Sequence, residues 1–242
     1  MNFFQFIKQN LLHFRLKNIF LALGIAISAT VITGSLIVGD SVRFSLNKIV
    51  ENRLGKITHV VKYGERFFSS DLSAKLAEDL KVNAASALLV NGIASAEGGR
   101  TRIGNIQVLG IDKNFDDMAG LSDYFGKLSV DEVILSSNLA ERLGLTIGDD
   151  VLLRIAKASL IPLNAPFVSD KENIVSVRLR IAGIAGTEQM GRFNLRNSQT
   201  SPYNAFVSYE RLCELMDFKG KANLIFLEDE GKLTIDQIFK GI

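Results

Sequence analysis

The hydrophobic pattern begins with an uninterrupted apolar segment near the N-terminus. Residues 19–38 are twenty residues without a charged side chain. At about 1.5 Å per residue, a helix of this length covers the roughly 30 Å hydrocarbon core of a bilayer. A buried helix of a soluble protein is usually shorter, and a secretory signal has a shorter apolar region before its cleavage site. The pattern therefore predicts a transmembrane helix over 19–38, with those two readings as alternatives.

An amphipathic pattern precedes this segment. Within residues 1–18, large apolar side chains recur at helical spacing opposite polar and basic ones, as in helices that lie in a membrane interface. We expect a cytoplasmic amphipathic helix over 1–18 that either anchors the chain to the membrane surface or docks a cytoplasmic partner. The candidate docking residues are Phe4, Ile7, Lys8, Leu11 and Arg15.

The apolar stripe continues beyond the membrane segment with a period of 3.6 residues. Gly55 is a suitable C-terminal stop, and Gly39–Asp40 is the place where a kink is expected. We predict a stalk helix over 39–55 that continues the membrane helix. An apolar stripe outside the bilayer needs another surface to bury it. The candidate packing residues are Val42, Leu46, Ile49 and Leu54.

Short strand and helix signals alternate over residues 56–242. The expected strands are 57–63, 87–94, 103–111, 133–135, 151–155, 175–181, 205–207 and 224–227. The expected helices are 71–80 with Ser70 as cap, one from Ser136 or Ser137 to Gly144, 209–216, and one from Thr234 onward. This pattern predicts an α+β extracytoplasmic domain over 56–242, composed of two small lobes.

Charge is distributed unevenly along the chain. No acidic residue precedes Asp40, whereas Lys8, Arg15 and Lys17 all do. Without these three, the 28 basic residues become 25 against 26 acidic ones, so the body is nearly neutral. A nucleic-acid partner would require a concentrated basic excess there. The basic flank instead predicts a cytoplasmic N-terminus and an extracytoplasmic body.

The sequence offers little catalytic chemistry. It has one cysteine and two histidines, which argues against a disulfide framework and against a histidine-based metal centre. No phosphate-binding Gly-x-x-x-x-Gly-Lys-Ser/Thr motif occurs. Cys213 lies in an amphipathic pattern typical of a buried structural thiol. Asp112, Asp116 and Asp117 resemble a solvated turn without calcium-loop spacing. We expect that the chain is not an enzyme and that it binds no cofactor and no metal.

Two segments stand apart from the regular pattern. Residues 157–173 form a long loop with two prolines, for which function and simple flexibility are equally open. Residues 192–206 are rich in arginine, asparagine and aromatic residues. They form either a loop whose side chains satisfy its own backbone or a partner surface. The candidate surface residues are Arg192, Arg196, Gln199, Tyr203 and Asn204.

Several longer motifs carry a family resemblance. LALGIAISATVITGSLIVGDSVRFSL, VILSSNLAERLGLTIGDDVLLRI and VRLRIAGIA occur in this order, with Gly148–Asp149 in a helix-to-strand turn. The combination resembles the FtsX-like permeases of ABC transporters, including MacB-type proteins, over nearly the whole chain. Such permeases carry at least four spans, whereas this chain has one. It therefore resembles the N-terminal part of a longer permease, or a truncated product.

This resemblance implies a mechanical function in the inner membrane. ATP hydrolysis in a cytoplasmic ABC ATPase would drive movement of an extracytoplasmic MacB-like core domain, for export or handling of envelope substrates. The implied partners are that ATPase, the lipid bilayer, and further permease spans or a second permease copy. The alternative is a single-span anchored binding or scaffold protein without an ATPase partner.

Overall fold

The computed structural model describes residues 3–62, 66–96, 99, 101–157, 174–196, 200–229, 233 and 238. The chain consists of two compact units, which are residues 1–49 and residues 50–242. The predicted loop over 157–173 lies outside the described residues except for Lys157, and the predicted last helix from Thr234 does so except for Ile238. The candidate residue Gln199 also lies outside them.

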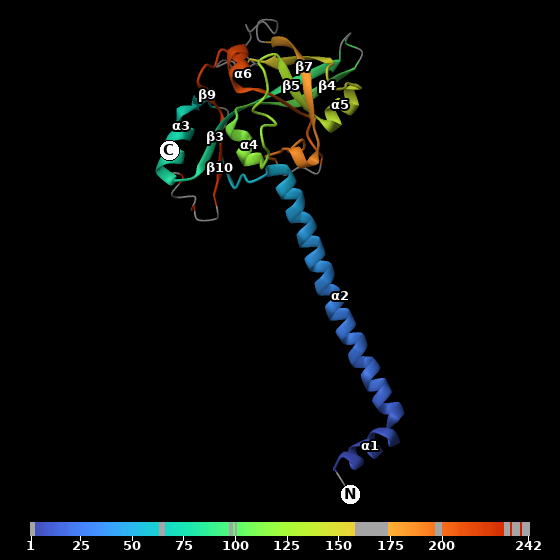
Figure 1. Ribbon diagram of the computed structural model, residues 1–242. Coiled ribbons are helices and arrows are strands. Elements are labelled where there is room, and N and C mark those ends of the chain that lie inside the picture. The colour runs from blue at the N-terminus through green and yellow to red at the C-terminus, as the bar shows by residue number, and fades with distance from the viewer. Residues whose placement is uncertain are drawn as a thin grey trace, which may run out of the picture. The chain divides into compact units, whose positions relative to one another are not determined.

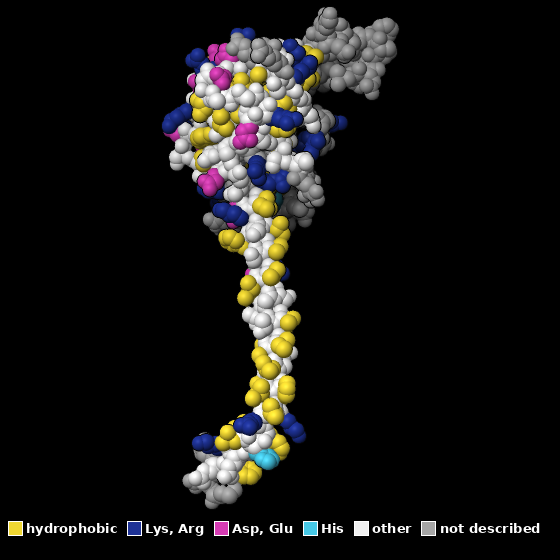
Figure 2. Space-filling view, turned by 90° about the vertical axis from the view of Figure 1, so that its right-hand side faces the viewer, with side chains coloured by type: hydrophobic (Ala, Val, Ile, Leu, Met, Phe, Trp, Pro, Cys, Tyr) yellow, Lys and Arg dark blue, Asp and Glu magenta, His cyan; other side chains and the backbone are white. Residues whose placement is uncertain are grey.

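Two helices make up the N-terminal region. Helix α1 spans Phe3–His13, and after a turn at Phe14 helix α2 spans Arg15–Leu54 (Figure 1). Helix α2 has 40 residues and is assigned as helix through Gly39–Asp40. Within the described residues it alone is long and apolar enough to cross a membrane, and Figure 2 shows hydrophobic side chains along it.

Two hydroxyl side chains within the apolar segment, Ser28 and Thr30, form hydrogen bonds with the helix itself. Ser28 Oγ donates a hydrogen bond to the Gly24 carbonyl at 2.9 Å, and Thr30 Oγ1 donates to the Ala26 carbonyl at 2.7 Å. Bonds to the carbonyl four residues earlier are common for these residues in helices. They remove the cost of an unpaired hydroxyl in lipid. The segment is thus compatible with a bilayer despite its polar residues.

Six strands of the second unit close into a ring (Figure 1). Each strand pairs with the next in the order β3-β4-β8-β5-β7-β6, and β6 pairs back onto β3. The β4–β8 and β5–β7 pairs are parallel, and the others are antiparallel. The strands are β3 Asn83–Ala96, β4 Arg102–Ile111, β5 Glu132–Ser136, β6 Asp150–Ala156, β7 Ile174–Ala185 and β8 Asn204–Ser208.

The length of β3 allows the sheet to continue outside the ring. Its first residues, from Asn83 to Ala87, pair with β10, Leu224–Glu228, and its last residues pair with β6. Strand β10 in turn pairs with β1, His59–Val61. A second, two-stranded sheet joins β2, Phe68–Ser69, to β9, Lys221–Ala222. The strand that follows α2 is therefore an edge strand of the main sheet.

Short helices cover the sheet. They are α3 Asp71–Leu80, α4 Asn114–Ala119, α5 Ser137–Leu143 and α6 Tyr209–Met216, with a 3₁₀ turn at Thr187–Gln189. Helix α5 ends at Gly144 in the left-handed conformation, as its sequence predicted. Ser70 precedes α3 but makes no capping hydrogen bond through its side chain, so that detail of the prediction is wrong.

The core confirms the alternating pattern of the strands. Val177, Leu179 and Ile181 are buried in β7, whereas the residues between them are exposed. Inward-facing side chains of the ring pack with apolar residues of α5 and α6 in one cluster. The α+β class is confirmed. Residues 50–242 form one compact unit, and their subdivision into two small lobes stays a prediction.

Candidate functional site

The last turn of α2 belongs to the same compact unit as the sheet, which begins at Val50. The helix ends at Leu54, and the amide of the following residue, Gly55, donates to the Glu51 carbonyl at 2.7 Å. Gly55 has φ +58°, and a Cβ there would lie 2.5 Å from the Met118 carbonyl oxygen. The left-handed conformation and the close backbone approach both require glycine. The end of the helix is therefore seated directly on α4.

Hydrogen bonds hold the chain that leaves the helix. The Lys56 amide donates to the Met118 carbonyl at 2.8 Å, and the Thr58 amide donates to the Leu227 carbonyl at 3.0 Å. The Thr58 hydroxyl also donates to Leu227 and accepts from the Asp229 amide. These bonds connect residues 56–58 to α4 and to the end of β10, and they leave the joint little freedom.

An aromatic cluster lies beneath this joint. Leu54 and Ile57 belong to a core formed with α4 and the outer face of the sheet. Phe115 is 1% exposed. Its ring centroid lies 5.4–6.4 Å from those of the surrounding phenylalanines, which are Phe125, Phe193, Phe206 and Phe226. Close-packed rings are rigid. The helix end thus rests on a closely packed part of the core.

Helix α4 departs from the sequence prediction. The expected solvated turn is a helix whose Asp116 is 4% exposed. The Asp116 carboxylate accepts hydrogen bonds from the Phe125 amide at 2.8 Å and the Gly126 amide at 2.7 Å. These charge-assisted bonds offset the cost of burying the carboxylate. Burial also raises the pKa of the nearby Asp112 carboxyl. The prediction is wrong for Asp116, where backbone donors replace water, whereas Asp117 is exposed as expected.

The segment rich in asparagine and arginine packs beside the joint. Asn204 is 1% exposed, and its side-chain amide donates to the carbonyls of Gly191 and Phe193 at 3.0 and 2.9 Å. Its side chain thus satisfies the backbone of its own loop, the alternative that the sequence left open. Arg192 and Arg196 are exposed, and Tyr203 is half-buried. Arg53 Nη2 donates to the Arg196 carbonyl at 3.3 Å.

The remaining candidate residues lie on the two N-terminal helices. Ile7, Lys8 and Leu11 are exposed on α1, Phe4 lies in the same helix, and Arg15 begins α2. The four stalk residues separate into two groups. Val42, Leu46 and Ile49 are 52–57% exposed, whereas Leu54 packs against the aromatic core. Sequence periodicity placed all four on one stripe but did not distinguish the seated residue from the exposed ones.

The structure offers no obvious reactive centre where it is described. No cluster of three or more His, Cys, Asp and Glu side chains there could hold a metal ion. Cys213 is 3% exposed in α6, and burial raises the pKa of its thiol. A raised pKa disfavours the reactive thiolate. The site therefore has a mechanical feature, which is the helix end seated on a packed core. The described residues show no catalytic feature.

Comparisons with known proteins give the family. The periplasmic region of MacB from Actinobacillus actinomycetemcomitans is 13% identical, with TM-score 0.46, over 80% of this chain and 85% of that one. The extracellular domain of the noncanonic ABC-type transporter YknZ from Gram-positive bacteria is 13% identical, with TM-score 0.45, over 74% and 80%. Curated proteins gave no match. The MacB-like periplasmic core domain matches residues 19–231, most of the chain, which therefore belongs to this family.

Proposed function

We propose that this chain is the N-terminal part of an ABC transporter permease that transmits movement from a cytoplasmic ATPase to its extracytoplasmic domain. The observation that carries the proposal is the continuity of α2. One helix contains the candidate transmembrane segment and also the last turn, which is seated in the β domain. A helix without an interruption transmits displacement along its axis better than a flexible linker does.

The other parts of the chain fit this role. The exposed amphipathic helix α1 offers a docking element for the ATPase through Ile7, Lys8 and Leu11. The exposed stalk residues offer a packing surface for another permease helix. Relative movement of packed rigid elements is a common form of nucleotide-driven switching. The joint at Gly55 would convert movement of the helix into movement of the domain.

Coupling is tested by making the stalk flexible. Insertion of two glycines between Gly39 and Asp40 is expected to reduce substrate movement per ATP hydrolysed several-fold, because each glycine weakens the helix by about 1 kcal/mol relative to alanine. A double glutamine variant, Leu46→Gln with Ile49→Gln, should also reduce substrate movement per ATP hydrolysed, because it removes the packing surface. The measurement uses the full-length permease with its ATPase in proteoliposomes. It records the amount of substrate moved and the amount of ATP hydrolysed.

The matched control is Gly39→Ala, because no atom lies within 4 Å of a Cβ built there and alanine favours the helix. It should retain the wild-type ratio. A wild-type ratio in the glycine insertion and in the double glutamine variant would mean that α2 is only a tether. The chain would then be an anchored binding or scaffold protein, the alternative function.

Orientation is tested by cysteine labelling. We expect a membrane-impermeant maleimide to modify Ile147→Cys in the β domain but not Gln9→Cys in α1 of intact cells, because the basic residues before the span retain the N-terminus inside. Ile147 is 63% exposed, and native Cys213 is buried, so the introduced thiols give the signal. Detergent permeabilisation should expose Gln9→Cys. Labelling of Gln9→Cys alone in intact cells would reverse the proposed topology.

A further inference from the structure

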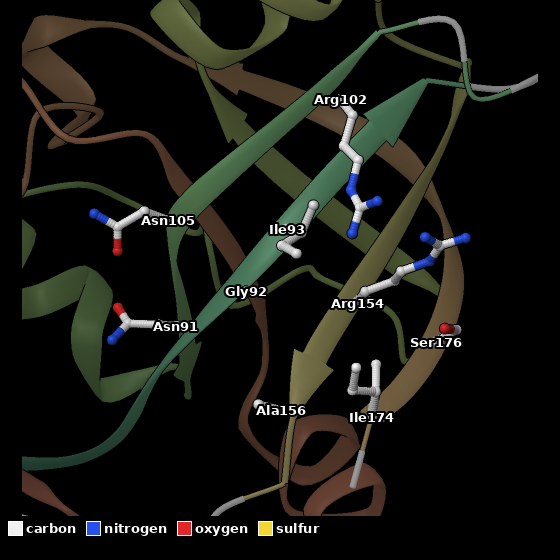
Figure 3. A pocket seen from close by; sticks show the side chains of 9 residues that line it. All are labelled: Asn91, Gly92, Ile93, Arg102, Asn105, Arg154, Ala156, Ile174 and Ser176. Atoms are coloured by element: carbon white, nitrogen blue, oxygen red, sulfur yellow. The ribbon is translucent and has the colours of Figure 1, made fainter. Parts of the chain in front are cut away.

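A groove lies on the outer surface of the strand ring, on the strands β4, β3, β6 and β7. Its volume is about 840 Å³, within the roughly 300–1,000 Å³ typical of ligand sites. Figure 3 shows Arg102, Ile93 and Arg154 side by side across these strands, with Asn91 and Asn105 further along the same surface. The groove has no role in the helix joint or in the proposed coupling.

The backbone creates this hollow. The β3–β4 register shifts between Gly92 and Ala94, and Asn105 opposite has φ +55°. Such a bulge bends a strand and redirects its side chains. A Cβ on Gly92 would lie 2.9 Å from the Arg154 carbonyl oxygen, so glycine allows β3 to approach β6 closely. The bulge in β3 and its close approach to β6 therefore form the floor of the groove.

Two arginines, Arg102 and Arg154, supply the positive charge that the described residues place on this surface. In the described part of the chain, no ion pair joins Arg102 or Arg154 to a carboxylate. Arg154 is half-buried, and Arg102 is exposed. Guanidinium groups bind carboxylate and phosphate through paired hydrogen bonds. The two arginines stand on strands separated by β3, two strand spacings or about 10 Å apart. This spacing is that of the two backbones, and each guanidinium group can pair with an anionic group of its own.

The other lining residues distinguish between anionic ligands. Asn91 and Asn105 each carry amide donors and a carbonyl acceptor. A phosphate or lipid head group offers mainly acceptors, whereas a peptide backbone offers both donors and acceptors. Ile93 and Ile174 add apolar surface, and Ile174 is 50% exposed. We propose that this groove binds an acidic peptide segment in an extended conformation, with Arg102 and Arg154 holding two of its carboxylates.

The test measures fluorescence anisotropy of a labelled hexapeptide in which glutamate and valine alternate, with the full chain in detergent. Arg154→Gln should weaken binding about tenfold, the effect of a hydrogen bond to a charged group at a half-buried site. Arg102→Gln should weaken it about threefold, because exposed ion pairs contribute less. The matched control is Arg142→Gln, an exposed arginine on α5, which should leave binding unchanged.

Three further measurements separate the ligand classes. The hexapeptide with glutamine in place of glutamate should bind at least tenfold more weakly. Glutamate at both Arg102 and Arg154 should transfer binding to a hexapeptide of alternating lysine and valine. Phosphatidylglycerol vesicles should bind equally to the wild type and to a variant that carries both Arg102→Gln and Arg154→Gln. Equal binding of both peptides, unchanged binding in the arginine variants, or arginine-dependent binding to vesicles alone would overturn the proposal.

Discussion

Replacement of Phe115 by alanine is expected to destabilise the second unit by about 3–5 kcal/mol, the usual cost of removing a fully buried phenylalanine. The ring is 1% exposed and packs against four other phenylalanines. For a unit of this size, the midpoint of thermal unfolding should fall by roughly 6–20 °C. Circular dichroism of the purified full chain in detergent measures this shift.

The matched control for this change is Ile147→Ala, at a residue that is 63% exposed. Surface substitutions usually change stability by less than about 0.5 kcal/mol, so its unfolding midpoint should stay within about 2 °C of the wild type. Similar midpoints for the two variants would show that the aromatic cluster does not support the helix joint.

Alanine at Gly55 is expected to produce the second large effect. A non-glycine residue in the left-handed conformation costs about 1–2 kcal/mol. The added Cβ would also lie 2.5 Å from the Met118 carbonyl oxygen, so the helix end or α4 must shift. We expect a lower unfolding midpoint and, because the joint moves, reduced transport per ATP hydrolysed in the full permease.

Gly144→Ala separates these two causes. Gly144 has φ +68°, and no atom lies within 4 Å of a Cβ built there. This variant therefore has the free-energy cost of the left-handed backbone conformation but no steric clash of the added Cβ. A larger loss of stability at Gly55 measures the contribution of its contact with α4. Equal losses at the two glycines would mean that the close approach is easily relieved and that the joint is soft.

Much of the fold follows from local patterns. The alternation in β7, the apolar run in α2 and the glycine stop of α5 each reflect a period or a turn preference that short segments reveal. The resemblance to MacB-type permeases is confirmed by the family match over residues 19–231. Ring closure was not predictable in this way, because the pairing of β3 with β6 joins residues about sixty positions apart and leaves no periodic signal.

The candidate site was predicted in part. The stripe on the stalk and the stop at Gly55 are visible in the sequence. The contact of Gly55 with Met118 is not, because the six residues of α4 are too few for a helical period and two of them are aspartates. For Asn204 the sequence left open whether the side chain satisfies its own loop or faces a partner, because asparagine occurs in both settings. Its burial depends on two carbonyls that the tertiary fold presents.

The pairing of β1 with β10 determines when the helix joint can form during biosynthesis. Thr58 and Leu227, which are hydrogen-bonded, are separated by 169 positions. Ribosomes add about 5–20 residues per second, so roughly 10–30 s separate the synthesis of the two partners. Throughout this interval α2 is complete, but the chain that follows it lacks its neighbouring strand, and Ile57 lacks part of its core. The seat of the helix is therefore among the last parts of residues 50–242 to assemble, after the helix itself has been synthesised.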